Sequence, residues 1–339
     1  MEVGELVEKI KKAPLGRYIF GGEEDYLKRY YAKELVRATI GEEADIFNYT
    51  VFDGEDVSFQ DLREAILSPS LMSDCKVIEW RFCNLEGMKE KALDELEELA
   101  ALQDDYPDTL LIITAAADGL EFSTGKNPSK LERRLGKHFN LVNFKKSTDR
   151  QLLGWLKRHF DANGVGVDAD TLNALLMRSG RVMDVLANEV AKLTALAKIR
   201  ELDKVSISDV EEVCSTTPES ETFALQNAIC SKDRVAAFRA LSDLKFRRID
   251  PAIIMAMMAR TFTELMNAAM LVRDADADKL DELFGIKGFR AKMCIAGAKR
   301  YGAEALVRIT GEISRLDASS KFGGINGYKL CEIIVSEYI

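Results

Sequence analysis

A glycine–acid turn near the start of the chain most constrains its fold and chemistry. Two glycines precede three carboxylates: Gly21, Gly22, Glu23, Glu24 and Asp25. The apolar run Tyr18–Phe20 comes before the turn, and apolar residues follow with helical spacing, so the segment predicts strand, turn and helix. A phosphate-binding loop here needs G-x-x-x-x-G-K-[ST], whose backbone N–H groups and lysine neutralise phosphate oxygens. These carboxylates suit the positive end of a helix but repel an anion.

From the turn alone, an ordinary acidic helix cap on an unrelated fold is the favoured interpretation, and a degenerate phosphate loop is the alternative. A second candidate for a phosphate-binding loop, Gly119–Asn127, contains Gly125 and Lys126. Its spacing is one residue too long, and Asn127 replaces the required hydroxyl residue, so we interpret it as a loop. We therefore expect no cofactor.

The composition predicts a globular, mainly helical chain. Its 339 residues suffice for two or three domains, with 47% hydrophobic and 30% charged residues and only six prolines. A net charge of −9 argues against gripping nucleic acid over the whole surface, although a local DNA contact stays open. The acidic start and the lack of an 18-residue apolar run predict neither secretory signal nor membrane span, and hence a cytoplasmic location.

The residue types that carry catalysis or bind metals show no suitable pattern. The six cysteines, at 75, 83, 214, 230, 294 and 331, include no C-x-x-C pair, so reduced thiols are expected rather than zinc or a disulfide framework. His138 and His159 have no nucleophile motif beside them. Most of the neighbouring helix carboxylates, such as Asp94, Glu95, Glu97 and Glu98, are expected to face solvent. No catalytic or metal-binding residue is predicted.

Residues 1–146 alternate short β-like runs with helical segments, which predicts a doubly wound α/β domain. The expected strands are Tyr18–Phe20, Ile46–Phe52, Lys76–Trp80, Thr109–Thr114 and His138–Phe144. The fourth run is apolar without alternation, as in a strand covered on both faces. No adjacent acidic pair follows it to hold magnesium.

The β-like runs stop at residue 147, and the rest of the chain is predicted to be helical. Helices expected at Asp149–Asn163, Asp168–Ser179 and Val182–Lys198 form a small domain over 147–213. The polar, proline-containing stretch Ser215–Ser220 predicts a linker or loop. An all-helical domain is expected over 214–339.

One connection between a helix and a strand carries two large apolar residues, Leu71 and Met72, between Ser70 and Ser73. Taken alone, these apolar residues are interpreted as core residues that close the connection, because such side chains are more often inside. Exposed anchors are the alternative.

Two basic clusters could meet DNA phosphates or an acidic partner. They comprise Lys130, Arg133, Arg134, Lys137, Lys145 and Lys146, and then Lys245, Arg247 and Arg248. Ordinary hydrated surface charge is the favoured interpretation, because charge runs are usually solvated.

Taken in order, these segments resemble the delta-subunit family of bacterial DNA polymerase III clamp loaders over essentially the full chain. Tyr18–Leu27 looks like the family's glycine–acid turn, and Ser70–Ile78 looks like its clamp-contacting segment. Gly180–Leu193 resembles its helix ending in E-x-x-K-L, and Phe223–Ile229 with Leu316–Lys321 resembles its C-terminal collar. No single motif is specific, so the order and spacing carry the resemblance.

The resemblance implies an AAA+-like (RecA-like) domain with a degenerate phosphate loop, a lid-type helical bundle and an all-helical collar for oligomerisation. Such a subunit binds and opens the sliding clamp (beta) for loading onto primed DNA during replication, without hydrolysing ATP. It works in a hetero-pentamer with the gamma/tau motor subunits, which supply the ATP cycle, and delta-prime. Any nucleotidyltransferase activity belongs to the DNA-directed DNA polymerase holoenzyme by association.

The resemblance also implies a clamp-binding site. Leu71 and Met72 match the family's hydrophobic pair, with Ser70 and Ser73 beside them. The family commonly has an aromatic residue where Met72 stands, but methionine adapts to irregular apolar pockets. The implied site is therefore a contact surface without catalytic residues.

Two other functions stay open from the sequence. An AAA+-like ATPase with an unusual phosphate loop would be revealed by a nucleotide-binding titration. A helical DNA-binding or adaptor protein is disfavoured by the acidic charge, and the salt dependence of its DNA affinity would identify it.

Overall fold

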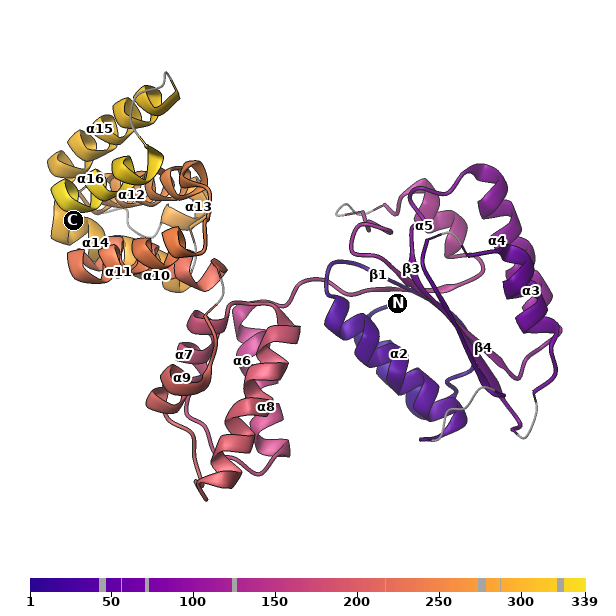
Figure 1. Ribbon diagram of the computed structural model, residues 1–339. Helices are drawn as coiled ribbons and strands as arrows, with labels where there is room; N and C mark the ends of the chain where they lie inside the picture. The colour runs from indigo at the N-terminus through magenta and orange to yellow at the C-terminus, as the bar shows by residue number, and fades with distance from the viewer. Residues whose placement is uncertain are drawn as a thin grey trace. The chain divides into compact units, whose positions relative to one another are not determined.

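In the computed structural model, the chain folds into two compact units, Met1–Gln151 and Leu152–Ile339 (Figure 1). The structure describes residues 1–42, 47–55, 57–70, 73–123, 127–216, 218–273, 279–286, 288–321 and 326–339. None of the helices in these ranges combines the length and apolar character that a membrane crossing requires. Across the same ranges, His, Cys, Asp and Glu side chains form no group of three that could hold a metal ion.

Five parallel strands form the sheet of the first unit, in the order β2-β3-β4-β1-β5. They are β1 (Gly16–Gly21), β2 (Tyr49–Asp53), β3 (Lys76–Cys83), β4 (Thr109–Ala115) and β5 (Asn140–Asn143). The five predicted strands are thus confirmed. β5 begins two residues later than expected, because the N–H groups of His138 and Phe139 still donate to Leu135 O in the turn before it. Ile46, the expected start of β2, lies outside the described residues.

Helices cover both faces of this sheet (Figure 1). They are α1 (Val3–Lys12), α2 (Asp25–Ile40), α3 (Phe59–Leu67), α4 (Glu90–Gln103) and α5 (Lys130–Leu135). In β4, Leu110 and Ile112 pack in the core beneath α1 and α2, whereas Leu111 and Ile113 pack in the core beneath α3, α4 and α5. Successive residues of a strand point to opposite faces, so a continuous apolar run is what a doubly covered strand requires.

The second unit is helical. Its helices are α6 (Asp149–Ala162, which begins in the first unit), α7 (Ala169–Ser179), α8 (Met183–Ile199), α9 (Ile207–Val213), α10 (Pro218–Ser231), α11 (Arg234–Phe246), α12 (Pro251–Arg273), α13 (Leu280–Phe284), α14 (Gly288–Tyr301), α15 (Ala303–Lys321) and α16 (Gly327–Tyr338). The helices expected between 149 and 198 form as α6, α7 and α8. The helix α9 was not expected; it begins with a capping box in which Ser206 N donates to Asp209 Oδ2 over 2.8 Å.

The stretch Ser215–Ser220 is only partly a loop. Pro218 is the first residue of α10, where its fixed φ and missing N–H suit the start of a helix, so the loop prediction was wrong for 218–220. Side chains from α10 to α16 share one apolar core, centred on residues such as Phe262 and Leu265. The proposed division into residues 1–146, 147–213 and 214–339 stays a prediction.

Candidate functional site

The glycine turn follows β1 and folds back onto the end of β5. Gly22 has φ +95°, and a Cβ there would lie 2.6 Å from both Asn143 Oδ1 and Phe144 O. Phe144 N donates to Gly21 O over 2.9 Å, and Glu24 N donates to Phe144 O over 3.0 Å. The close backbone approach therefore explains Gly22, and a Cβ at Gly21 would lie 2.8 Å from Phe122 Cε2, so neither glycine requires a ligand.

Replacing Gly22 with alanine is expected to destabilise the chain more than the same change at Gly41. Both glycines have positive φ, but a Cβ at Gly41 meets nothing within 4 Å. The difference isolates the clash with Phe144 and Asn143, for which we expect about 1 to 3 kcal/mol. Urea unfolding of both variants measures it, and equal midpoints would contradict the packing described for this turn.

A lysine occupies the crevice beside the turn. Lys28 of α2 is 1% exposed; its Nζ donates to Ala115 O over 2.8 Å and pairs with Asp25 Oδ1 at 2.7 Å. Ala115 ends β4, the neighbour of β1, and chain connections diverge between these two strands. Open α/β sheets bind ligands at the carboxyl ends of strands at such a point. Here a protein ammonium already lies there with protein oxygens as partners.

The carboxylates of the turn differ in exposure. Glu23 is exposed, whereas Glu24 is 8% exposed and lies against the end of β5 through its backbone hydrogen bond. Sequence reasoning named these residues but missed Lys28. The i, i+3 spacing of Asp25 and Lys28 on a helix is the signal that could have indicated their pairing.

The loop between α3 and β3 holds the candidate contact residues. Leu71 and Met72 lie outside the described residues. Ser70 Oγ donates to Ser73 O over 2.6 Å and to Cys75 O over 3.3 Å, and Cys75 N donates to Ser73 Oγ over 3.4 Å. The two serines therefore link the described ends of this loop. Whether they also contact a partner stays a prediction.

Lys76, the first residue of β3, joins the two ends of this loop. Its side chain is buried, and Nζ donates to Ala65 O over 3.0 Å, to Ile66 O over 2.6 Å and to Ser68 O. These carbonyls end α3, where a positive charge also suits the helix dipole. Burial lowers the pKa of Lys76, and the nearby Asp108 carboxylate opposes that shift. The sequence offered Lys76 only as a strand residue, so this anchoring role was missed.

Comparison with known protein families decides the identity of the chain. A family model described as DNA polymerase III, delta subunit, matches residues 18–144, and one described as the C-terminal domain of that subunit matches residues 219–338. The chain belongs to the DNA polymerase III delta-subunit family.

Individual members of the delta-subunit family extend over nearly the whole chain. DNA polymerase III subunit delta of Bacillus subtilis is 21% identical over 327 residues, which cover 95% of this chain and 92% of that protein. The probable DNA polymerase III subunit delta of Aquifex aeolicus is 25% identical over 310 residues, covering 90% and 85%. The solved structure of the Bacillus subtilis DNA clamp loader delta protein has a TM-score of 0.55 at 19% identity, covering 99% of each chain, and shows the same fold. The predicted fold, an α/β part built on a parallel sheet and followed by a helical part, is therefore confirmed.

In this delta-family chain, several basic residues suggested as DNA contacts have internal partners. Arg134 Nε contacts Glu97 Oε1 at 2.6 Å, and its other nitrogens contact Glu90 and Asp94. Asp94 and Glu97 thus pair with α5 at the surface, where Asp94 is 65% exposed and Glu97 is 31% exposed, so the expectation that most of these carboxylates face solvent is not contradicted. Helical spacing of three and four residues aligns these α4 carboxylates on one face.

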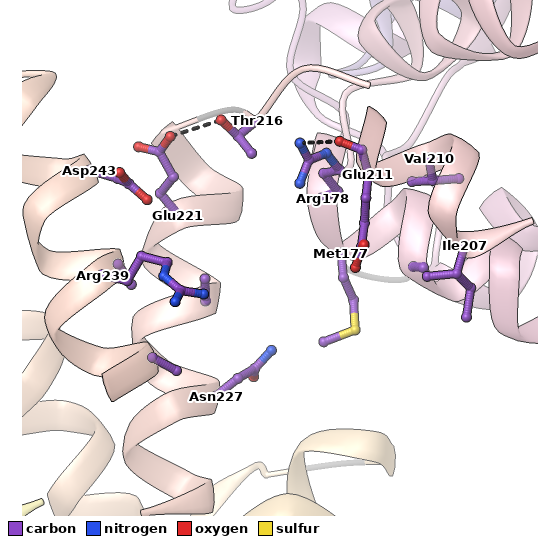
Figure 2. Close-up of a pocket in the computed structure, with 14 residues that line it drawn as sticks. Met177, Arg178, Ile207, Val210, Glu211, Thr216, Glu221, Asn227, Arg239 and Asp243 are labelled. Atoms are coloured by element: carbon purple, nitrogen blue, oxygen red, sulfur yellow. Dashed lines mark hydrogen bonds between the residues drawn. The ribbon is translucent and has the colours of Figure 1, made fainter. Parts of the chain in front are cut away.

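The second basic cluster is also partly paired. Lys245 Nζ lies 2.8 Å from Glu332 Oε1, and Arg247 Nε lies 2.7 Å from Glu221 Oε1, which also accepts from Thr216 Oγ1 (Figure 2). Glu221 borders a groove of about 360 Å³ between α7, α9, α10 and α11, where Met177 and Ile207 are partly exposed. None of the candidate site residues lines this groove. The paired cations weaken the DNA-adaptor interpretation.

Proposed function

We propose that this chain binds the sliding clamp and opens it as a clamp-loader delta subunit that does not hydrolyse ATP. The observation that carries the proposal is the closed crevice at the carboxyl ends of β1 and β4. Lys28 lies there against Ala115 O and Asp25, at the place where a phosphate would need free positive charge. With that crevice closed, a delta subunit would act by binding the clamp and not by hydrolysing ATP.

The ends of the central strands support the same conclusion. β3 ends in Arg81, Phe82 and Cys83, and β4 ends in Ala115, so neither supplies an adjacent acidic pair for magnesium. Gly21 and Gly22 pack against protein atoms, and Glu23 and Glu24 add negative charge at the helix start. Triphosphate binding would have to overcome both charge and packing.

The proposed clamp contact is the loop from Ser70 to Ser73, with Leu71 and Met72 as the apolar anchors. Ser73, the described end of this loop, comes three residues before Lys76 and therefore lies near the edge of the sheet where the strands begin, opposite the carboxyl ends of β1 and β4. Lys76 and the two serines fix the ends of the loop, which lowers the entropy that docking must remove. A loop with fixed ends that carries two large apolar residues suits an apolar pocket on a ring.

The helical C-terminal part, residues 214–339, is proposed to assemble with the gamma/tau motor subunits and delta-prime in a cytoplasmic hetero-pentamer that acts on primed DNA. Large apolar side chains on its described surface support a contact role: Phe246 is 89% exposed, Ile253 61% and Leu283 58%.

The purified chain is expected to release cognate clamp rings from nicked circular DNA with no nucleotide present. Contact energy alone opens the ring under this proposal, so adding ATP should leave the release rate unchanged. Gel filtration of labelled clamp, which elutes with the DNA until it is released, measures the rate. A Lys28→Met variant should also release the clamp at a rate that ATP does not change, since Lys28 is proposed to hold no phosphate.

Release that depends on ATP, or stoichiometric ATP bound beside Glu23, would overturn the non-hydrolysing role. Failure to bind the clamp with or without the motor subunits would overturn the contact role itself.

A further inference from the structure

Two cysteines meet inside the C-terminal helices. Cys230 of α10 and Cys294 of α14 are 1% and 0% exposed, and both are free thiols. The two thiols interact, because each is a cause of the other's shifted pKa, and Cys294 Sγ lies 4.0 Å from Glu264 Oε2. The clamp contact and the closed crevice do not use this pair.

The pair lies where α10 and α14 approach each other closely. A Cβ at Gly297 would lie 2.8 Å from Cys230 O and 3.4 Å from Cys230 Cα, so only glycine permits this approach. Arg300 Nη1 donates to Cys230 O over 3.2 Å, and Tyr301 OH donates to Ile229 O over 2.9 Å. Cys294 lies one turn before Gly297 on the same face of α14. Disulfides require such closely spaced backbones, and this crossing supplies one.

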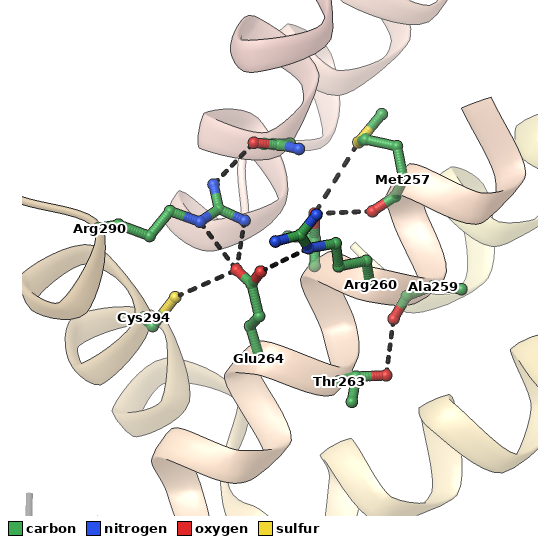
Figure 3. A network of polar contacts seen from close by, with 9 residues as sticks. Met257, Ala259, Arg260, Thr263, Glu264, Arg290 and Cys294 are labelled. Atoms are coloured by element: carbon green, nitrogen blue, oxygen red, sulfur yellow. Dashed lines mark hydrogen bonds and ion pairs between the residues drawn. The ribbon is translucent and has the colours of Figure 1, made fainter. Parts of the chain in front are cut away.

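A polar network borders the Cys294 thiol (Figure 3). Glu264 Oε2 of α12 accepts from Arg290 Nε over 2.8 Å and from Arg290 Nη2 over 2.5 Å, and it lies 4.0 Å from Cys294 Sγ. The hydrogen bond from Cys294 lowers the pKa of Cys230 against the effect of burial, and the positive charges of Arg290 and Arg300 act in the same direction. The same hydrogen bond and burial raise the pKa of Cys294. We assign Cys230 as the attacking thiol, because the guanidinium of Arg300 lies beside it, with Nη1 donating to Cys230 O over 3.2 Å, and positive charge favours the reactive thiolate.

We propose that Cys230 and Cys294 are a redox modification site at which a peroxide forms a reversible disulfide between α10 and α14. The Cys230 thiolate attacks one peroxide oxygen and the O–O bond breaks; the departing hydroxide takes up the proton that Cys230 had released, so the products are a sulfenic acid and one water. The Cys294 sulfur then attacks the Cys230 sulfur, the S–OH bond breaks, and a second water leaves with the Cys294 proton. Two thiols and one hydrogen peroxide thus give one disulfide and two waters, with the peroxide as the oxidant.

Treatment of the full chain with hydrogen peroxide, followed by alkylation of free thiols and digestion without reductant, is expected to give a linked peptide pair containing Cys230 and Cys294. Dithiothreitol should separate the pair. Because the link closes a long loop between two helices, the thermal midpoint should rise by about 5 °C and fall again on reduction. Both sulfurs are buried, so the reaction should take hours and follow openings between α10 and α14.

Cys75, which is partly exposed, reports within the same sample that the oxidant reached the protein. Cys331→Ala should keep the linked pair, and Cys230→Ser should lose it together with the rise in midpoint. The proposal is overturned if Cys75 is oxidised while Cys230 and Cys294 are both recovered as free thiols in the wild-type chain. It is equally overturned if either cysteine is found linked to a different one.

Discussion

Replacing Leu71 and Met72 together with alanine is expected to weaken binding of the purified cognate clamp by roughly two to four decades. Fully burying each side chain in an apolar pocket contributes about 1.5 to 3 kcal/mol, and the double variant removes most of both contributions. Isothermal titration or fluorescence anisotropy with labelled clamp measures the change. Thermal unfolding should be nearly unchanged, because the prediction places both side chains at the surface.

Ile199→Ala provides the matched control. Ile199 is 81% exposed at the end of α8, so this change removes a comparable apolar side chain from a surface that the proposal does not use. Its clamp affinity should equal that of the wild type. If the double variant binds the clamp as tightly as Ile199→Ala does, Leu71 and Met72 are not the anchors. If it unfolds instead, the two residues belong to the core, as their sequence alone suggested.

The sheet could be predicted because its signals are local. In β4, four successive apolar residues, 110–113, require cover on both faces, and alternate members fill two separate cores. The ends of strands were less predictable, because they depend on neighbours. β3 continues past Trp80 through a bulge between Arg81 and Cys83, where Phe82 takes φ +61°. A bulky residue seldom adopts that conformation, so no sequence pattern indicates it.

In the candidate sites, too, features that depend on local sequence could be predicted, and features that depend on distant residues could not. The absence of a G-x-x-x-x-G-K-[ST] motif can be seen in the order of residues alone, and it was sufficient to argue against a phosphate-binding loop. Closure of that crevice could not be predicted, because Lys28 and Ala115 are 87 residues apart. Lys76 likewise contacts carbonyls from the preceding helix, and a lysine at the start of a strand gives no sign of such acceptors. Long-range pairing of polar side chains with backbone atoms is what sequence reasoning missed.

Lys76→Met is expected to lower the free energy of unfolding by about 2 to 4 kcal/mol and to weaken clamp binding at least tenfold. Methionine matches the length of lysine but donates no hydrogen bond, so the carbonyls of Ala65 and Ile66 lose their buried partner. With its ends released, the loop that carries Leu71 and Met72 must be ordered during docking, which reduces affinity. Urea unfolding and clamp titration of the same preparation measure the two effects.

Lys91→Met is the control, because Lys91 is 89% exposed on α4 and its loss should change stability by about 0.5 kcal/mol or less. Measuring the stability difference between wild type and Lys76→Met at several pH values adds a second test, because a purely steric role of the Lys76 side chain would not depend on pH. Burial holds the pKa of Lys76 in the folded chain below its ordinary value of 10.5. At a pH between the lowered pKa of the folded chain and 10.5, the unfolded chain therefore binds more protons than the folded chain. The contribution of Lys76 to stability therefore grows as pH rises through that interval, and the stability gap between wild type and Lys76→Met should widen. A gap that stays constant with pH, together with unchanged clamp affinity, would show that Lys76 does not anchor this loop.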